Sequence, residues 1–182
     1  DYVEIAAKNN IHVFCEKPPA RTLNELQIVK KTYEKFPNLK LMYGFNHRFH
    51  LSVEEAKRII QSNTLGKIIN MKGAYGKSQI ISFNQTDWRT KREDSGGGIL
   101  LDQGIHMLDL IRYLSGKDFS KIFSFIDNAF WNYDVEDNAY VLMKSSDGVV
   151  AQLHSSATQW RHVFKLEITF QKGSLVLGGL LT

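Results

Sequence analysis

Residues 163–171, Val-Phe-Lys-Leu-Glu-Ile-Thr-Phe-Gln, alternate apolar and polar side chains. A period of two is typical of a strand with one face on a core and the other in solvent. Outward from this stretch, the pattern predicts further strands over 67–77, 122–130, 138–144, 149–155 and 174–177. Tight turns are expected at Asp147-Gly148 and Lys172-Gly173. The second half of the chain is therefore predicted to be α+β, a mixed and mostly antiparallel open sheet with helices on one face.

The first half of the chain follows a different rhythm, in which helices and strands alternate. Residues 11–15 and 39–45 resemble short buried parallel strands, and residues 23–36 carry a helical pattern between them. Thr22 with Glu25, and Ser52 with Glu55, are spaced as reciprocal caps at the starts of two helices. This alternation predicts part of a doubly wound α/β domain.

Composition limits the class of protein. The chain has 182 residues, of which 43% are hydrophobic and 23% charged, so it can bury a core. The net charge of +4 is scattered, and the one tight basic group, Arg89, Lys91 and Arg92, is followed at once by the acidic residues 93–94. We therefore expect no nucleic-acid partner. The lone Cys15 and the lack of a long apolar run predict a cytoplasmic protein with no membrane partner.

Residues 98–114 form a strongly apolar helical stretch that carries three ionisable groups. At about 100° per residue, Asp102, His106 and Asp109 lie within about 60° of one another. Burying these groups along one stripe is costly unless they are paired or functional. Three interpretations stay open, namely core groups that are satisfied by backbone donors, a catalytic site, or ligands of a divalent metal in a hydrolase or isomerase.

Two further motifs are candidates for chemistry. Residues 96–98 are three consecutive glycines, which would let a backbone or a ligand approach the start of the helix, where an anionic group is favoured. Glu16-Lys17-Pro18 follows a predicted strand directly, and ligands of open α/β sheets bind at the carboxyl ends of strands. Lys17 is therefore placed for chemistry.

Taken together, these motifs resemble those of the glucose-fructose oxidoreductase and inositol dehydrogenase (Gfo/Idh/MocA) family, over about residues 1–173. The resemblance is carried by Val13 to Pro18, Gly44 to Phe49, Leu65 to Ile68, Asp87 to Arg89, Gly96 to Gly98, and the series Asp102, Gly104, His106, Asp109.

The resemblance implies an oxidoreductase that uses NAD or NADP and acts on a sugar, nucleotide sugar or cyclitol. It implies that Lys17, Asp102 and His106 are catalytic, with His106 as general base, Lys17 stabilising negative charge and Asp102 orienting the ring or binding a hydroxyl. It places Glu16, Lys17, Pro18, Trp88 and Arg89 at the cofactor, and Asn46, Arg48, Asp102 and His106 at the substrate. Asp109 would be a structural partner.

The resemblance also implies two domains and a homo-oligomer. Residues 1–48 would be the C-terminal remnant of a dinucleotide-binding Rossmann domain, and residues 49–182 an α/β domain for substrate binding and oligomerisation. The glycine-rich turn G-x-G-x-x-G is absent from the sequence. We therefore expect a fragment that lacks an N-terminal segment of roughly 80 residues and cannot bind the cofactor fully. A non-catalytic assembly module is the remaining alternative.

Overall fold

The computed structural model describes residues 2–78 and 88–179. Its N-terminal part consists of α1 (Tyr2–Lys8), β1 (Val13–Cys15), α2 (Leu23–Tyr33) and β2 (Leu41–Tyr43). The two strands pair in parallel, with Val13 opposite Leu41. Because a helix connects two adjacent parallel strands, the predicted βαβ unit is confirmed.

Local capping explains where α2 begins. The hydroxyl of Thr22 accepts a hydrogen bond from the backbone N–H of Glu25 at 3.2 Å, as the sequence predicts. The Glu25 carboxylate does not return to Thr22, however, because it accepts from the backbone N–H of Arg21 at 3.0 Å and from the Arg21 guanidinium. The cap is therefore real but not reciprocal.

A short 3₁₀ turn, η1 (Asn46–Phe49), leads from β2 into α3 (Leu51–Gln61). The predicted cap at Ser52 is wrong. The N-cap residue is His50, whose side chain makes no capping hydrogen bond. The turn at η1 fixes the helix start, since the N–H groups of Val53 and Glu54 both donate to the carbonyl of His50.

The second part of the chain is built on a six-stranded sheet in the order β4-β5-β6-β3-β7-β8. The strands are β3 (Ile68–Ser78), β4 (Phe119–Asp127), β5 (Asn138–Ser145), β6 (Val150–Gln159), β7 (Val163–Phe170) and β8 (Gly173–Gly178). β3 and β6 pair in parallel and the other neighbours are antiparallel. The predicted mixed, mostly antiparallel sheet is confirmed.

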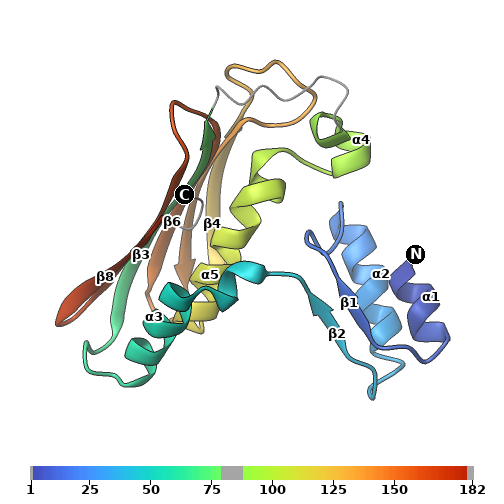
Figure 1. Ribbon diagram of the computed structural model, residues 1–182, viewed down its shortest axis with the longest axis horizontal. Helices are drawn as coiled ribbons and strands as arrows, with labels where there is room; N and C mark the ends of the chain where they lie inside the picture. Colours follow the sequence, from blue (N-terminus) through green and yellow to red (C-terminus); the bar gives the residue numbers. More distant parts are fainter. Residues whose placement is uncertain (1, 79–87, 180–182) are drawn as a thin grey trace.

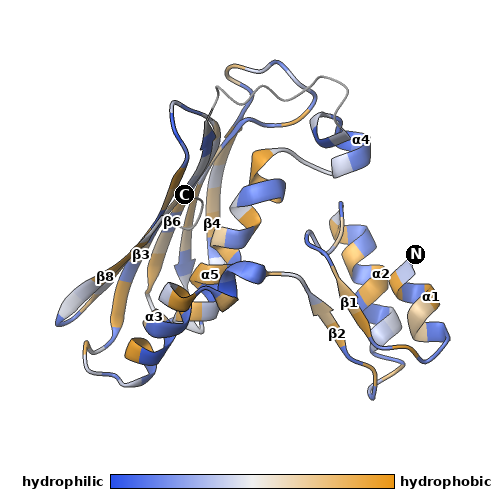
Figure 2. Cartoon of the chain, viewed as in Figure 1, coloured by the Kyte–Doolittle hydropathy of each residue, from blue (hydrophilic) through white to orange (hydrophobic). Residues whose placement is uncertain are grey.

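Helices α3 and α5 (Ile105–Ser115) cover one face of this sheet, and the small N-terminal sheet with α1 and α2 lies beyond them (Figure 1). Figure 2 shows apolar residues of α5 turned toward the sheet. The core between them includes the buried side chains of Met71, Met107, Leu110, Ile111, Leu166 and Ile168. In β7, Phe164, Leu166, Ile168 and Phe170 are all buried, which confirms the alternation in the sequence.

The polar composition of residues 79–95 predicts a loop. Its described part instead contains the 3₁₀ turn η2 (Trp88–Thr90) and the short helix α4 (Arg92–Ser95), and a π-helical turn, η3 (Leu100–Gly104), follows before α5. Residues 79–87 of that predicted loop lie outside the described residues. In the part of the chain that the structure describes, no helix is both long enough and apolar enough to cross a membrane.

Candidate active site

Lys17 and Asp102 meet although 85 residues separate them in the chain. The Lys17 ammonium donates to the backbone carbonyl of Asp102 at 2.5 Å and to its Oδ1 at 3.0 Å. Lys17 follows the end of β1 and begins a turn whose Lys17–Pro18 peptide bond is cis. Asp102 comes from the turn before α5. Two motifs that the sequence singled out separately therefore form one site.

The π-helical turn changes which way the three ionisable groups of this stretch point. A π turn is wider than an α turn, so angles computed at a regular helical period do not hold across Asp102. Asp102 contacts two lysines, His106 stacks on another histidine, and Asp109 pairs with an arginine. Among the described residues no three His, Cys, Asp or Glu side chains are grouped to hold a metal ion.

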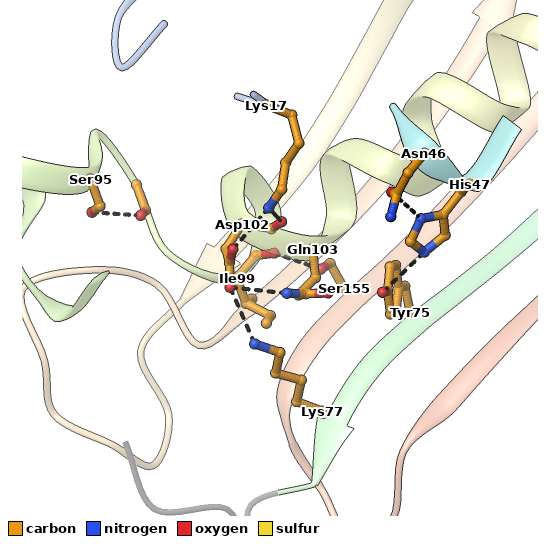
Figure 3. A network of polar contacts seen from close by, with 11 residues as sticks. Lys17, Asn46, His47, Tyr75, Lys77, Ser95, Ile99, Asp102, Gln103 and Ser155 are labelled. Atoms are coloured by element: carbon orange, nitrogen blue, oxygen red, sulfur yellow. Dashed lines mark hydrogen bonds and ion pairs between the residues drawn. The ribbon is translucent and has the colours of Figure 1, made fainter. Parts of the chain in front are cut away.

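Lys77 is a site residue that the sequence analysis missed. Its ammonium lies 3.3 Å from Asp102 Oδ2, on the side opposite Lys17 (Figure 3). Gln103 Nε2 donates to the same oxygen at 3.1 Å. Burial opposes the ionisation of Asp102, but Lys77 and Lys17 more than offset burial and lower the pKa of this carboxyl to about 2. Asp102 is therefore ionised at neutral pH.

A second group that the sequence analysis missed is His47, which lies against His106. The two rings stack with centroids 4.1 Å apart. His47 is held by Asn46 Oδ1 at 3.0 Å from its Nδ1 and by the hydroxyl of Tyr75 at 3.2 Å from its Nε2 (Figure 3). The signal in the sequence was its place inside the Gly44 to Phe49 motif, in which only the neighbouring Asn46 and Arg48 were singled out.

His106 is buried at the start of α5. Burial, the neighbouring His47 and the Lys17 charge lower its pKa to about 3, although the Asp102 charge acts in the opposite direction. The imidazole is therefore neutral at neutral pH. Its Nδ1 is buried and has no hydrogen-bond partner among the described residues. A buried polar atom without a partner calls for a specific explanation, such as a ligand hydroxyl that pairs with it.

Arg48 and Asp109 form a two-pronged ion pair. Arg48 Nε donates to Asp109 Oδ2 at 2.7 Å, and its Nη2 donates to Oδ1. The Arg48 guanidinium also lies over the Tyr113 ring, 4.9 Å from its centroid. The pair joins η1 to α5, as expected for Asp109 as a structural partner. Asn46, in the same turn, uses its side-chain oxygen on His47.

Gly98 admits a backbone segment, and the carboxyl group at the start of the helical segment is the protein's own Glu136. A Cβ on Gly98 would lie 2.0 Å from the carbonyl oxygen of Glu136. That carbonyl accepts from the N–H of Ile99 at 3.1 Å, and Glu136 Oε1 accepts from the N–H of Leu100 at 3.2 Å. Gly98 thus lets the loop before β5, at Glu136, pack directly against this helical segment.

The remaining predicted residues surround a hollow beside Asp102. Its lining includes Pro18, Trp88, Arg89 and Asp102. The Arg89 guanidinium lies over the Trp88 ring, 4.5 Å from its centroid. Glu16 lies between the end of β1 and Lys17, and a Cβ on Gly44 would lie 3.2 Å from its Oε2. The structure thus places Glu16 against the end of β2, and Pro18, Trp88 and Arg89 around a hollow that Asp102 shares.

Comparison with known proteins gives one family model, described as the GFO/IDH/MocA C-terminal domain, which matches residues 53–176. Glucose-6-phosphate 3-dehydrogenase of Bacillus subtilis is 36% identical over 59% of this chain and 31% of its own length. The scyllo-inositol 2-dehydrogenase (NAD(+)) of Bacillus subtilis is 27% identical over 99% of this chain and 52% of its own. The chain therefore spans about a third to a half of the length of these curated relatives.

Solved structures of the same kind share the fold. A levoglucosan dehydrogenase in complex with NADH and levoglucosan is 28% identical, with a TM-score of 0.87 over 97% of this chain and 50% of that chain. The myo-inositol 2-dehydrogenase of Lactobacillus plantarum is 28% identical, with a TM-score of 0.83 over 96% of this chain and 52% of that chain.

Proposed function

The chain belongs to the GFO/IDH/MocA family, whose C-terminal domain model matches residues 53–176, and on this premise we propose that the protein is an oxidoreductase that uses NAD or NADP. It transfers a hydride between the cofactor and a secondary alcohol of a sugar, nucleotide sugar or cyclitol. Relatives named as sugar and inositol dehydrogenases support this class of substrate. The proposal concerns the whole protein.

The observation that carries the proposal is the contact between Lys17 and Asp102, which lies one turn before His106 on the same helical segment. The Lys17 ammonium forms an ion pair with Asp102. The Lys17 charge lowers the pKa of the His106 imidazole, and the Asp102 charge raises it. Oxidation of an alcohol needs a group that takes the hydroxyl proton and a group that stabilises negative charge on the oxygen. A neutral imidazole next to an ammonium supplies both within one small site.

We propose that the nicotinamide end of a dinucleotide cofactor lies over the hollow bounded by Pro18, Trp88 and Arg89, which has Asp102 in its wall. The hollow itself, at about 20 Å³, is too small to enclose the ring, so the cofactor lies across its mouth. When bound, the cofactor supplies the hydride acceptor, or the hydride in the reverse direction. The sequence contains no G-x-G-x-x-G turn for the pyrophosphate, so the residues of this chain fit only part of the cofactor.

We assign the roles as follows. His106 accepts the proton of the substrate hydroxyl; its Nδ1 is buried and has no hydrogen-bond partner among the described residues. Lys17 has three N–H donors, of which two are directed at Asp102, so one is left for the substrate oxygen. Asp102 holds that ammonium in place. Asn46 acts through His47, and Arg48 through its pair with Asp109, at the edge of the substrate site.

The division of the chain into a dinucleotide-binding part, 1–48, and a substrate-binding part, 49–182, is part of the proposal. The parallel β1–β2 unit before η1 and the six-stranded sheet after α3 support it. Arg89 beside the hollow is suited to a phosphate or diphosphate, because a guanidinium binds such groups through two hydrogen bonds. The position of Arg89 is therefore compatible with a nucleotide-sugar substrate as well as with a simple sugar.

We also propose that the protein self-associates through the sheet face that α3 and α5 leave open. Phe123, Phe125, Tyr140 and Leu142 form an uncharged patch on this face and are 48–65% exposed. The four residues pair across β4 and β5, with Phe123 opposite Leu142 and Phe125 opposite Tyr140. Clustered exposed aromatic groups on an edge strand favour association, and an uncharged patch can pair with its own copy.

The test is turnover by protein expressed from its complete reading frame, with sugars and inositols as substrates. His106→Ala should lower kcat at least about 100-fold, the usual contribution of a general base. His162→Ala, an exposed histidine far along the chain, serves as the control and should keep normal turnover. Near-normal turnover of His106→Ala rejects the assigned role. Failure of the unchanged protein to bind NADH or NADPH in a fluorescence titration rejects the cofactor assignment.

A further inference from the structure

Lys77 reaches the proposed active site from the end of β3, a strand that also contributes the buried Met71 and Tyr75 to the core. Its ammonium lies 3.3 Å from Asp102 Oδ2. The side chains of Lys17, Lys77 and Asp102 are 17%, 23% and 21% exposed, so the three charges sit largely out of water. A pair held in this way interacts more strongly than an ion pair on an open surface.

Each oxygen of the Asp102 carboxylate therefore faces its own ammonium, from a different part of the fold. Oδ1 faces Lys17 from the turn after β1, and Oδ2 faces Lys77 from the sheet (Figure 3). Gln103 adds a neutral donor to Oδ2 at 3.1 Å. Without Lys77, the sheet would no longer hold the carboxylate, and rotation about its Cβ–Cγ bond would move Oδ1 away from Lys17.

We propose that Lys77 is a positioning residue, which acts by fixing the Asp102 carboxylate so that Asp102 in turn aims the Lys17 ammonium at the substrate oxygen. This inference rests on the proposed function, because it needs Lys17 to contact substrate. A shift of about 1 Å in a catalytic group is enough to lower turnover about 100-fold. If Lys77 acts only through Asp102, the loss should appear in kcat rather than in KM.

The charges around Asp102 determine what removal of Lys77 does. Lys17 and Lys77 face Asp102 from two different elements, and His106 lies one turn away on α5. Tyr75, on β3, has a pKa raised to about 12, mainly by burial and also by the Asp102 charge. Arg89 and Glu136 line a second hollow, which Asp102 also borders. Burial opposes ionisation of Asp102, and the Lys77 charge is the largest cause that lowers its pKa.

The experiment compares Lys77→Met and Lys77→Arg with Lys72→Met, a matched control in which an exposed lysine of the same strand is changed. Carboxyl carbon NMR of the protein follows the titration of Asp102 in each variant. We expect Lys77→Met to raise its pKa by at least about one unit, as loss of an opposite charge within about 4 Å should. We expect Lys77→Arg and Lys72→Met to leave the pKa close to that of the unchanged protein.

In steady-state assays, kcat of Lys77→Met should fall about 10- to 100-fold with little change in KM, and Lys77→Arg should recover most of it. An unchanged Asp102 pKa in a folded Lys77→Met variant overturns the inference, and so does normal kcat in that variant. If the unchanged protein oxidises no substrate while Lys77→Met still raises the Asp102 pKa, the proposed function fails and the electrostatic contact stands. The NMR titration thus separates the two failures.

Discussion

The imidazole rings of His47 and His106 stack with 21° between their planes and centroids 4.1 Å apart. Burial is the main cause that lowers the pKa of His106 to about 3 and of His47 to about 4. Both rings are therefore neutral in the folded protein at neutral pH. A neutral His106 keeps a lone pair, although a pKa of about 3 makes it a weaker base than an exposed imidazole.

These depressed pKa values predict a pH dependence of stability. The folded protein resists protonation of both rings, whereas the unfolded chain takes up protons near pH 6.5. The unfolded state therefore binds more protons, and stability falls as the pH falls below about 6.5. Each histidine should contribute about 1.4 kcal/mol per pH unit down to its folded pKa.

Urea unfolding at pH 7, 6 and 5 measures this slope. His47→Phe keeps an aromatic ring without a titrating group, so its slope should be smaller by about 1.4 kcal/mol per pH unit. The carboxyl of Asp102 does not interfere, because its pKa is lowered from 3.8 and its contribution is lost only below that value. A slope that is the same in both proteins would contradict the assignment of a neutral, buried His47.

Two neighbouring glycines should respond differently to the same substitution. A Cβ on Gly98 would meet the Glu136 carbonyl oxygen at 2.0 Å, whereas a Cβ on Gly97 would meet Leu101 Cβ at an ordinary 3.4 Å. Gly98→Ala should therefore destabilise the protein by about 1–3 kcal/mol or more and displace Asp102. Gly97→Ala should change stability by less than about 1 kcal/mol. Thermal unfolding checks both, and equal losses would refute the packing argument.

The Arg48–Asp109 pair should matter more for stability than for turnover. Asp109 is largely buried, with 10% of its side chain exposed, so Asp109→Asn leaves the Arg48 charge poorly compensated. We expect a loss of about 2–4 kcal/mol in the free energy of unfolding. Arg48→Lys keeps the charge but loses the paired hydrogen bonds, and it should be less damaging. A large rise in KM of Arg48→Lys with normal stability would instead make Arg48 a direct substrate ligand.

The open sheet face predicts a change in oligomeric state. Phe125→Lys places a charge in the middle of the exposed aromatic patch and should shift the protein toward the monomer. Leu51→Lys, at a position that is 83% exposed at the start of α3, is the control and should not alter assembly. Light scattering after gel filtration measures both. A Phe125→Lys variant that keeps the size of the unchanged protein would place the interface elsewhere.

Much of the fold follows from short-range patterns. The alternation in residues 163–171 predicts β7 because its spacing matches the pleat of a strand, and Thr22 marks the start of α2 because its hydroxyl accepts from a residue three positions on. Ser52 carried the same local signal, but the prediction that it caps α3 was wrong. The 3₁₀ turn η1 leads directly into α3, so His50 is the N-cap residue and Ser52 lies inside the first turn of the helix.

Some residues of the candidate site could also be recognised in the sequence, and others could not. Lys17, Asp102 and His106 stand out in the sequence because buried ionisable residues next to glycines and strand ends are unusual. Lys77 carries no such local signal, and the only signal for His47 is its place inside the Gly44 to Phe49 motif, because the roles of both come from the groups that they meet across the fold.

The sequence by itself determined the helices and strands, since hydrophobic period and capping act over a few residues, and it determined which ionisable side chains are expensive to bury. Only the tertiary structure decided that Asp102 lies between two ammonium groups, that His106 stacks on His47 and that Glu136 occupies the start of the helical segment. Those contacts join residues that are far apart in the chain, so they depend on how the strands pair and on the wider π turn that redirects Asp102.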